Sequence, residues 1–270
     1  MPMSLKKWNV ICATTHLVCF GIVLGLTIVI EKINVFRLPV QTSYARWDDD
    51  VGPITELQEI GKFPFAAVTT VVPFLSFMAH VYAATFGWSR YKDNINHCRN
   101  PLRWVEYAFS ASLMFVLIAM LFAIYDVSLL ITLFTLNATV MYMGHVMETV
   151  NPLLGLTKTI EMPIKWQPFI IGSSISVVEW ALLYSTLASA DYSKIPWFVY
   201  ALVFSYFFLY ISFALNMVWF YCNPNGYKKG NLTLTTIEKF MQTEKNYMWL
   251  SLFSKTLLLI LIFWGTLMPN

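Results

Sequence analysis

YMWLSLFSKTLLLILIFW, residues 247–264, decides the fold, because it is apolar over a length that crosses a bilayer and carries one lysine, Lys255, about midway. A charged lysine at the centre of a spanning helix costs roughly 2.5 to 3.5 kcal/mol on insertion scales, so such residues usually face the protein interior and serve a function. Pairing with a carboxylate avoids this cost. Covalent conversion also avoids it, since a desolvated lysine can attack an aldehyde to form a Schiff base.

The composition indicates a multi-pass integral membrane protein. Of the 270 residues, 57% are hydrophobic and 12% are charged, whereas charged residues make up about a quarter of soluble domains. The apolar run after the N-terminal lysines reaches Ile30 without a small-residue cleavage site, which favours a retained first helix over a signal peptide. The net charge of +3 is too small to indicate a nucleic-acid partner. The four scattered cysteines suggest neither a metal site nor a disulfide framework. The sequence shows neither a nucleophile paired with a base nor a phosphate-binding glycine loop, so an enzyme is not expected.

Hydropathy predicts one seven-helix domain covering residues 1–270. In lipid the apolar segments must be helices, because these helices satisfy their backbone hydrogen bonds internally. The longest connection, residues 31–62, is long enough to hold structure of its own. The predicted helices are residues 8–30, 63–87, 102–124, 127–150, 166–188, 196–222 and 247–267.

The positive charges in the loops predict the orientation. Twelve lysines and arginines fall on the side of the N-terminus and five on the opposite side, and Lys255 completes the eighteen. Because cytoplasmic loops carry the excess of positive charge, the N-terminus is expected inside the cell and the C-terminus outside. The expected location is the cell or plasma membrane, with lipid as the surrounding partner.

The predicted orientation places most intramembrane polar residues in the cytoplasmic half. Histidines near helix ends are also common as packed side chains, and the alternative for Glu148 is contact with lipid headgroups. The polar residues of this half are His16, His80, Glu106, His145 and Glu148.

The last segment presents a polar face toward the same half. Glu244, Tyr247, Ser251 and Lys255 recur at intervals of three, four and four residues, which places them on one side of a helix. Beyond Lys255 the segment is almost wholly apolar. A water-accessible or hydrogen-bonded cavity is therefore expected between Lys255 and the cytoplasm, with a drier outer half.

Glu106 is the predicted partner of Lys255. Arg103 lies three residues before it and Ser110 four residues after it, so an arginine, a carboxylate and a hydroxyl share one helix face. A carboxylate beside a buried cation acts as its counterion, and a purely structural ion pair is the alternative. Glu179, past the middle of the fifth helix, breaks the pattern because it lies in the drier half.

The motifs around these residues resemble those of heliorhodopsins, seven-helix retinal proteins with an inverted membrane topology. RWVEYAFSASLM, residues 103–114, is similar to the third helix of that family. The likeness extends over essentially the whole chain and includes THL at His16, FLSFMAH ending at His80, MGHVMETVN around Glu148, ISFALNM containing Asn216, and EKNYMWLSLFSK ending at Lys255.

This resemblance implies that Lys255 carries all-trans retinal as a protonated Schiff base. It implies that Glu106 is the counterion and that Ser251 is a nearby hydrogen-bonding partner. His16 and His80 match positions in a polar cavity that receives the proton. Glu148 and Asn216 match recurring polar positions whose role is less clear. The resemblance further implies a homodimer and a small sheet or hairpin in residues 31–62, outside the membrane.

The resemblance predicts a light-sensing photoreceptor that passes a slow conformational signal to an unknown partner. Eleven residues after the counterion, where outward proton pumps keep a carboxylate, the chain has Leu117, so active pumping is not expected. Glu179 leaves open a light-gated passive proton channel that uses Glu106 and Glu179. A transporter that keeps Lys255 in an ion pair, without sensing light, is the alternative outside the family.

Overall fold

The computed structural model describes residues 2–151, 163–188, 195–222 and 234–267. Within these ranges seven helices are long and apolar enough to cross a membrane, which confirms the predicted helical membrane fold. They are α1 (Pro2–Val29), α3 (Phe65–Ala84), α5 (Pro101–Leu121), α6 (Val127–Val150), α7 (Gln167–Ala188), α8 (Trp197–Cys222) and α9 (Leu234–Leu267).

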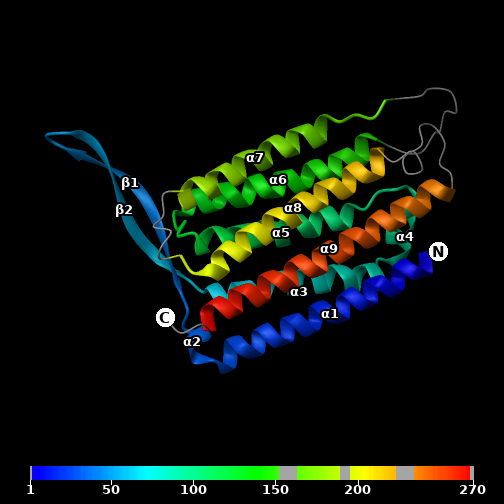
Figure 1. Cartoon of the computed structure of the whole chain (residues 1–270), viewed down its shortest axis with the longest axis horizontal. Helices are drawn as coiled ribbons and strands as arrows, with labels where there is room; N and C mark the ends of the chain where they lie inside the picture. Colours follow the sequence, from blue (N-terminus) through cyan, green and yellow to red (C-terminus); the bar gives the residue numbers. More distant parts are fainter. Residues whose placement is uncertain (1, 152–162, 189–194, 223–233, 268–270) are drawn as a thin grey trace.

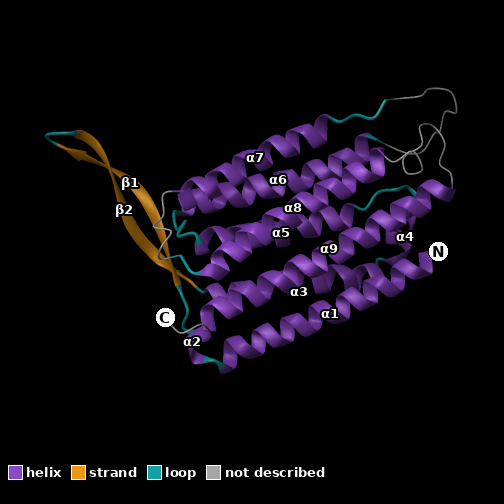
Figure 2. Ribbon diagram, viewed as in Figure 1, coloured by secondary structure: helices purple, strands orange, loops and turns teal. Residues whose placement is uncertain are grey.

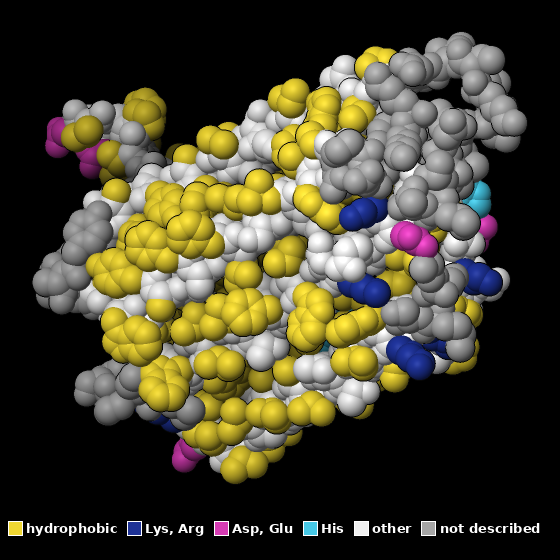
Figure 3. Space-filling view, turned by 45° about the vertical axis from the view of Figure 1, so that its right-hand side comes forward, with side chains coloured by type: hydrophobic (Ala, Val, Ile, Leu, Met, Phe, Trp, Pro, Cys, Tyr) yellow, Lys and Arg dark blue, Asp and Glu magenta, His cyan; other side chains and the backbone are white. Residues whose placement is uncertain are grey.

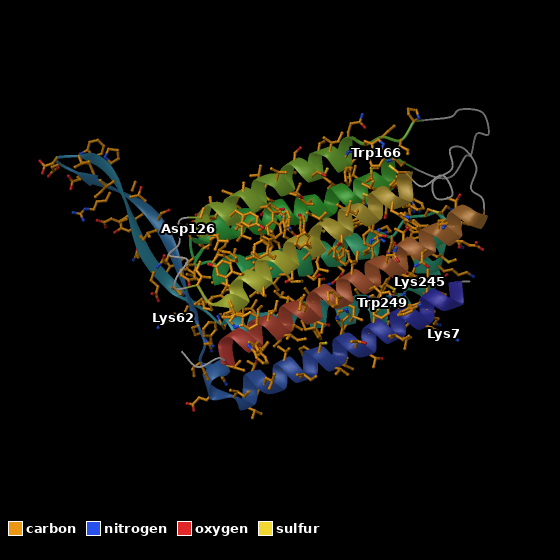
Figure 4. All side chains as sticks on the ribbon, in the orientation of Figure 1. Lys7, Lys62, Asp126, Trp166, Lys245 and Trp249 are labelled. Atoms are coloured by element: carbon orange, nitrogen blue, oxygen red, sulfur yellow. The ribbon has the colours of Figure 1, made fainter. Side chains whose placement is uncertain are left out.

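The seven long helices lie side by side, with the N-terminus and a β-hairpin at opposite ends of the bundle (Figure 1). We call these the amino end and the hairpin end. Lys7, Trp166 and Lys245 mark the amino end, whereas Lys62 and Asp126 mark the hairpin end (Figure 4). Two short helices complete the described helical structure, α2 (Glu31–Asn34) near the hairpin end and α4 (Trp88–Asn96) at the amino end.

The face of the bundle in Figure 3 carries many hydrophobic side chains along the helices, and charged side chains gather toward the amino end. Large side chains such as Ile28, Val105 and Phe208 are more than half exposed, which suits contact with lipid rather than water. The helix α5 is the central one, because 61% of its spanning window is buried inside the protein, against 22% in each of α6, α7 and α8. The polar residues Arg103, Ser110 and Ser112 of α5 are buried in the protein.

Three elements differ from the helices that hydropathy predicts, and the first is α1, which begins at Pro2 rather than near residue 8. The helix α9 begins at Leu234 rather than near residue 247, because its first turns are helix-forming but polar. The helix α4 is absent from the prediction because a search for spanning segments passes over a short polar stretch. Its Tyr91 and Ile95 are buried, and it packs against α3 and α9 at the amino end.

Residues 31–62 contain the predicted small sheet (Figure 2). Strands β1 (Leu38–Asp48) and β2 (Gly52–Phe63) pair antiparallel, with a register shift between Val40 and Gln41. Gly52 at the turn has φ +91°, a left-handed conformation that favours glycine.

Asp126 joins the hairpin to the bundle. Its carboxylate caps α6 by accepting a hydrogen bond from the Leu129 amide at 3.0 Å, and it also accepts from the amide and hydroxyl of Ser43, each at 3.2 Å. These donors, the Leu129 amide first, hold the pKa of Asp126 below its usual range. Gln41 adds a backbone hydrogen bond to the carbonyl of Tyr125 at 2.9 Å.

Candidate functional site

Lys255 is buried inside the bundle and holds three partners. Only 3% of its side chain is exposed. Its Nζ donates to Oε1 of Glu106 at 2.7 Å, to Oγ of Ser76 at 2.7 Å and to Oγ of Ser251 at 2.9 Å. The amine is therefore fully satisfied by one carboxylate and two hydroxyls, which offsets the cost of burying its charge.

Glu106 closes this network from the central helix α5. Its Oε1 also accepts a hydrogen bond from Ser76 at 2.7 Å. Ser110 is fully buried one turn further along α5, and its hydroxyl lies near Glu106 without completing a short hydrogen bond. The structure thus brings together Lys255, Glu106 and Ser251, with Ser110 beside them.

Ser76 is a site residue that the sequence did not reveal. It lies on α3, accepts from Lys255 and donates to Glu106, so it bridges the ion pair. A serine in an apolar helix usually bonds to the carbonyl four residues before it, and Ser76 also lies 3.4 Å from the Val72 carbonyl. Ser76 lies four residues before His80, so the two share a helix face, and this spacing was the one indication in the sequence. Such a spacing is too common to identify Ser76 as a site residue.

His16 and His80 form a stacked pair beside the ion pair. Their ring centroids are 5.6 Å apart and their planes differ by 9°. Nδ1 of His80 makes a 2.8 Å hydrogen bond to the Asn9 side chain, whereas Nε2 of His16 is buried without a hydrogen-bond partner among the described residues. Both rings interact electrostatically with Lys255 and Glu106.

Lys255 also lines an apolar pocket. It lies between α5, α6, α7, α8 and α9, and its walls are mainly aromatic and aliphatic. Lys255, Ser251 and Ser254 supply the wall from α9. We call this space the apolar pocket; the rings that line it include Trp104, Tyr107, Phe169, Tyr206, Tyr210 and Phe213.

Two glycines keep the apolar pocket open. A Cβ at Gly144 would lie 2.3 Å from the ring of Trp104, and one at Gly172 would lie 3.2 Å from Cβ of Met143. Because both glycines line the pocket, larger residues there would displace its walls. The arrangement fits an elongated apolar molecule with one end at the amine of Lys255.

Glu148 and Tyr247 lie apart from Lys255, around Arg103. Arg103 is 6% exposed and pairs with both Glu148 from α6 and Glu244 from α9. The Tyr247 ring lies 4.0 Å from its guanidinium. The burial of Glu148 excludes the alternative in which its side chain reaches the lipid headgroups, because it is 6% exposed and bound to Arg103.

Glu179 belongs to a third polar group, between α6, α7 and α8. It is fully buried, and the Tyr210 hydroxyl donates to its Oε2 at 3.1 Å. That hydroxyl also lies 3.0 Å from Ser176 and 3.4 Å from the Asn137 amide. No hydrogen bond among the described residues joins Glu179 to Lys255, although Tyr210 and Ser176 both line the apolar pocket.

Comparison with known proteins gives one family match. The family model described as Heliorhodopsin matches residues 5–267, which is nearly the whole chain. No curated protein matches the chain.

Proposed function

The chain belongs to the heliorhodopsin family and is therefore a retinal-binding, light-sensing rhodopsin, and from this premise we propose that all-trans retinal is bound to Lys255 as a protonated Schiff base with Glu106 as its counterion. The observation that carries this proposal is the position of one amine, Nζ of Lys255. It lies 2.7 Å from the Glu106 carboxylate and at the edge of the apolar pocket.

The residues around Lys255 suit this group. The retinal chain is apolar, as are the pocket walls, and the space kept by Gly144 and Gly172 suits a long polyene. A protonated Schiff base keeps the positive charge but has one N–H in place of three. It would donate to the Glu106 carboxylate, with the Ser76 and Ser251 hydroxyls beside it.

Retinal supplies a light-driven isomerisation, and the protein supplies the control of a proton. In the dark, Glu106 would accept the hydrogen bond of that proton, and Ser76 would donate to the same carboxylate. A change in the direction of the N–H bond weakens these contacts, because hydrogen bonds need alignment. The stacked pair of His16 and His80 lies next to the site, where the proton leaves it. We infer that this proton movement drives a slow conformational signal.

The half of α5 toward the hairpin end supports sensing rather than active pumping. Leu117 is fully buried, and so are its neighbours Phe115, Ile118 and Ala119. This part of α5 therefore offers no carboxylate that could return a proton. We further propose that the amino end is cytoplasmic, as the loop charges indicate.

Passive proton conduction is the second candidate function, and Glu179 favours it. A buried carboxyl is unusual in a membrane helix and commonly marks an ion or proton path. The Tyr210 hydroxyl connects Glu179 to the wall of the apolar pocket. A path from Glu106 past the pocket to Glu179 would carry protons toward the hairpin end.

Voltage-clamped cells that express the protein with retinal distinguish the two functions. For a light sensor we expect a slow absorption cycle and no photocurrent under any proton gradient. A photocurrent that reverses with the gradient would contradict this expectation. Loss of that current in Glu179→Gln, with the current kept in the exposed control variant Glu59→Gln, would establish conduction through Glu179.

A further inference from the structure

A second, polar cavity links the Lys255 site to the amino end. It has a volume of about 40 Å³, and its lining includes Glu106, the partner of Lys255, together with Arg103 and Glu244. We call it the polar cavity; Asn9, His80 and Asn100 also line it. A water molecule needs roughly 10 to 15 Å³ of such space, so the polar cavity has room for a few waters between the two carboxylates.

The polar cavity ends on a buried group with excess negative charge. Arg103 is the one cation that contacts Glu148 and Glu244 among the described residues, so the three side chains carry a formal charge of −1. The exposed fractions of the Glu148 and Glu244 side chains are 4% and 1%. Two buried carboxylates that share one guanidinium leave one carboxylate available as a base.

The geometry around Arg103 is fixed by several contacts. The amide of Asn100 donates to Glu148 at 2.8 Å, and its side chain donates to Glu244 at 2.7 Å. The rings of Tyr247 and Trp104 lie 4.0 and 4.6 Å from the guanidinium. These contacts hold Glu244 at the wall of the polar cavity.

We propose that Glu244 accepts the proton that leaves the nitrogen of Lys255 after light absorption. This inference rests on the proposed function. The N–H bond at Lys255 breaks, its electron pair stays on the nitrogen, and an O–H bond forms on the Glu244 carboxyl after transfer through water in the polar cavity. Glu106 keeps its negative charge, so the excess charge moves from the Arg103 group to Glu106.

Position and charge favour Glu244 over its neighbours. Glu148 is not among the residues that line the polar cavity. His80 does line it, but protonation there would leave the Arg103 group with its excess charge. A proton on Glu244 instead leaves Arg103 and Glu148 as a balanced pair, which lowers the cost of burying them.

Protonation of Glu244 would also change the packing of the amino end. Glu244 is the ion-pair partner that α9 gives to Arg103 on α5, and an uncharged carboxyl binds a guanidinium less strongly. The amino ends of α5 and α9 are then held mainly by Asn100 and by the ring contacts. This loosening gives the light-driven proton movement a structural consequence at one end of the bundle.

Light-induced infrared difference spectroscopy on the full retinal-bound chain tests this inference. The infrared band of a protonated carboxylic acid carbonyl is expected to rise as the visible band of the protonated Schiff base on Lys255 disappears. Glu244→Gln should remove that infrared band. The matched variant Glu179→Gln should keep it, because Glu179 is a buried carboxyl that does not line the polar cavity. If Glu244→Gln does not fold, Glu244→Asp should shift the frequency of the band.

Three results would overturn the assignment. They are a band that persists unshifted in both Glu244 variants, a band lost equally in Glu244→Gln and Glu179→Gln, and an unchanged carboxyl region while the nitrogen loses its proton. In each case the pigment still forms and responds to light, so the proposed function survives. A chain that forms no pigment at all would contradict the proposed function instead.

Discussion

Lys255→Ala protein expressed with retinal is expected to show no visible absorption band, whereas the wild-type chain and Lys245→Ala should both be coloured. The side chain of Lys255 is 3% exposed and lines the apolar pocket. Its amine contacts the Glu106 carboxylate. Lys245 is the matched control, because it lies on the same helix near the amino end (Figure 4). Absorption spectra of the purified proteins provide the measurement.

We expect Lys255→Ala to lose the visible band completely, because no other group replaces the amine. Alanine removes the nucleophile, and free retinal absorbs at shorter wavelength than a protonated Schiff base does. A variant without Lys255 that still forms the wild-type pigment would show that the chromophore is attached elsewhere. It would favour the alternative in which Lys255 and Glu106 form only a structural ion pair.

Glu106→Gln is expected to shift the visible band to longer wavelength. The negative charge 2.7 Å from Nζ of Lys255 keeps the positive charge at the nitrogen, and its removal lets that charge spread along the polyene. Glu106→Asp keeps the charge and should absorb closer to the wild type. An unchanged spectrum in Glu106→Gln would contradict the counterion role.

The same substitution should also destabilise the protein before retinal binds. Removing one partner of a buried ion pair typically costs about 3 to 5 kcal/mol, since the other charge stays buried without compensation. Ser76 and Ser251 still accept hydrogen bonds from Lys255, so we expect the lower part of this range. The free energy of unfolding of the retinal-free protein, measured for the wild type and Glu106→Gln, checks this expectation.

The sequence predicted the long helices because lipid leaves the backbone few choices. An apolar run that crosses a bilayer must be helical, and the interval rule then places Ser251 and Lys255 on one face of α9. The start of α9 and the short helix α4 were missed because they are not apolar runs that lipid forces into a helix. They lie at the amino end, where polar sequence allows several structures.

Partners on other helices were harder to predict than residues on one helix face. Arg103 and Glu106 share a face of α5, yet Arg103 pairs with Glu148 and Glu244 from α6 and α9. Ser76 is the clearest omission, because its role depends on how α3 packs against α5 and α9. Such pairings follow from tertiary packing, which one sequence does not encode in its spacing.

The position of the covalent bond is the most direct test of the account. Borohydride reduction converts a Schiff base into a stable secondary amine, so the retinyl group stays on its lysine during proteolysis. Mass spectrometry of the digested pigment should find this group on the peptide that contains Lys255 and on no other lysine. A retinyl group on a different lysine, or retinal recovered only in free form, would contradict the account.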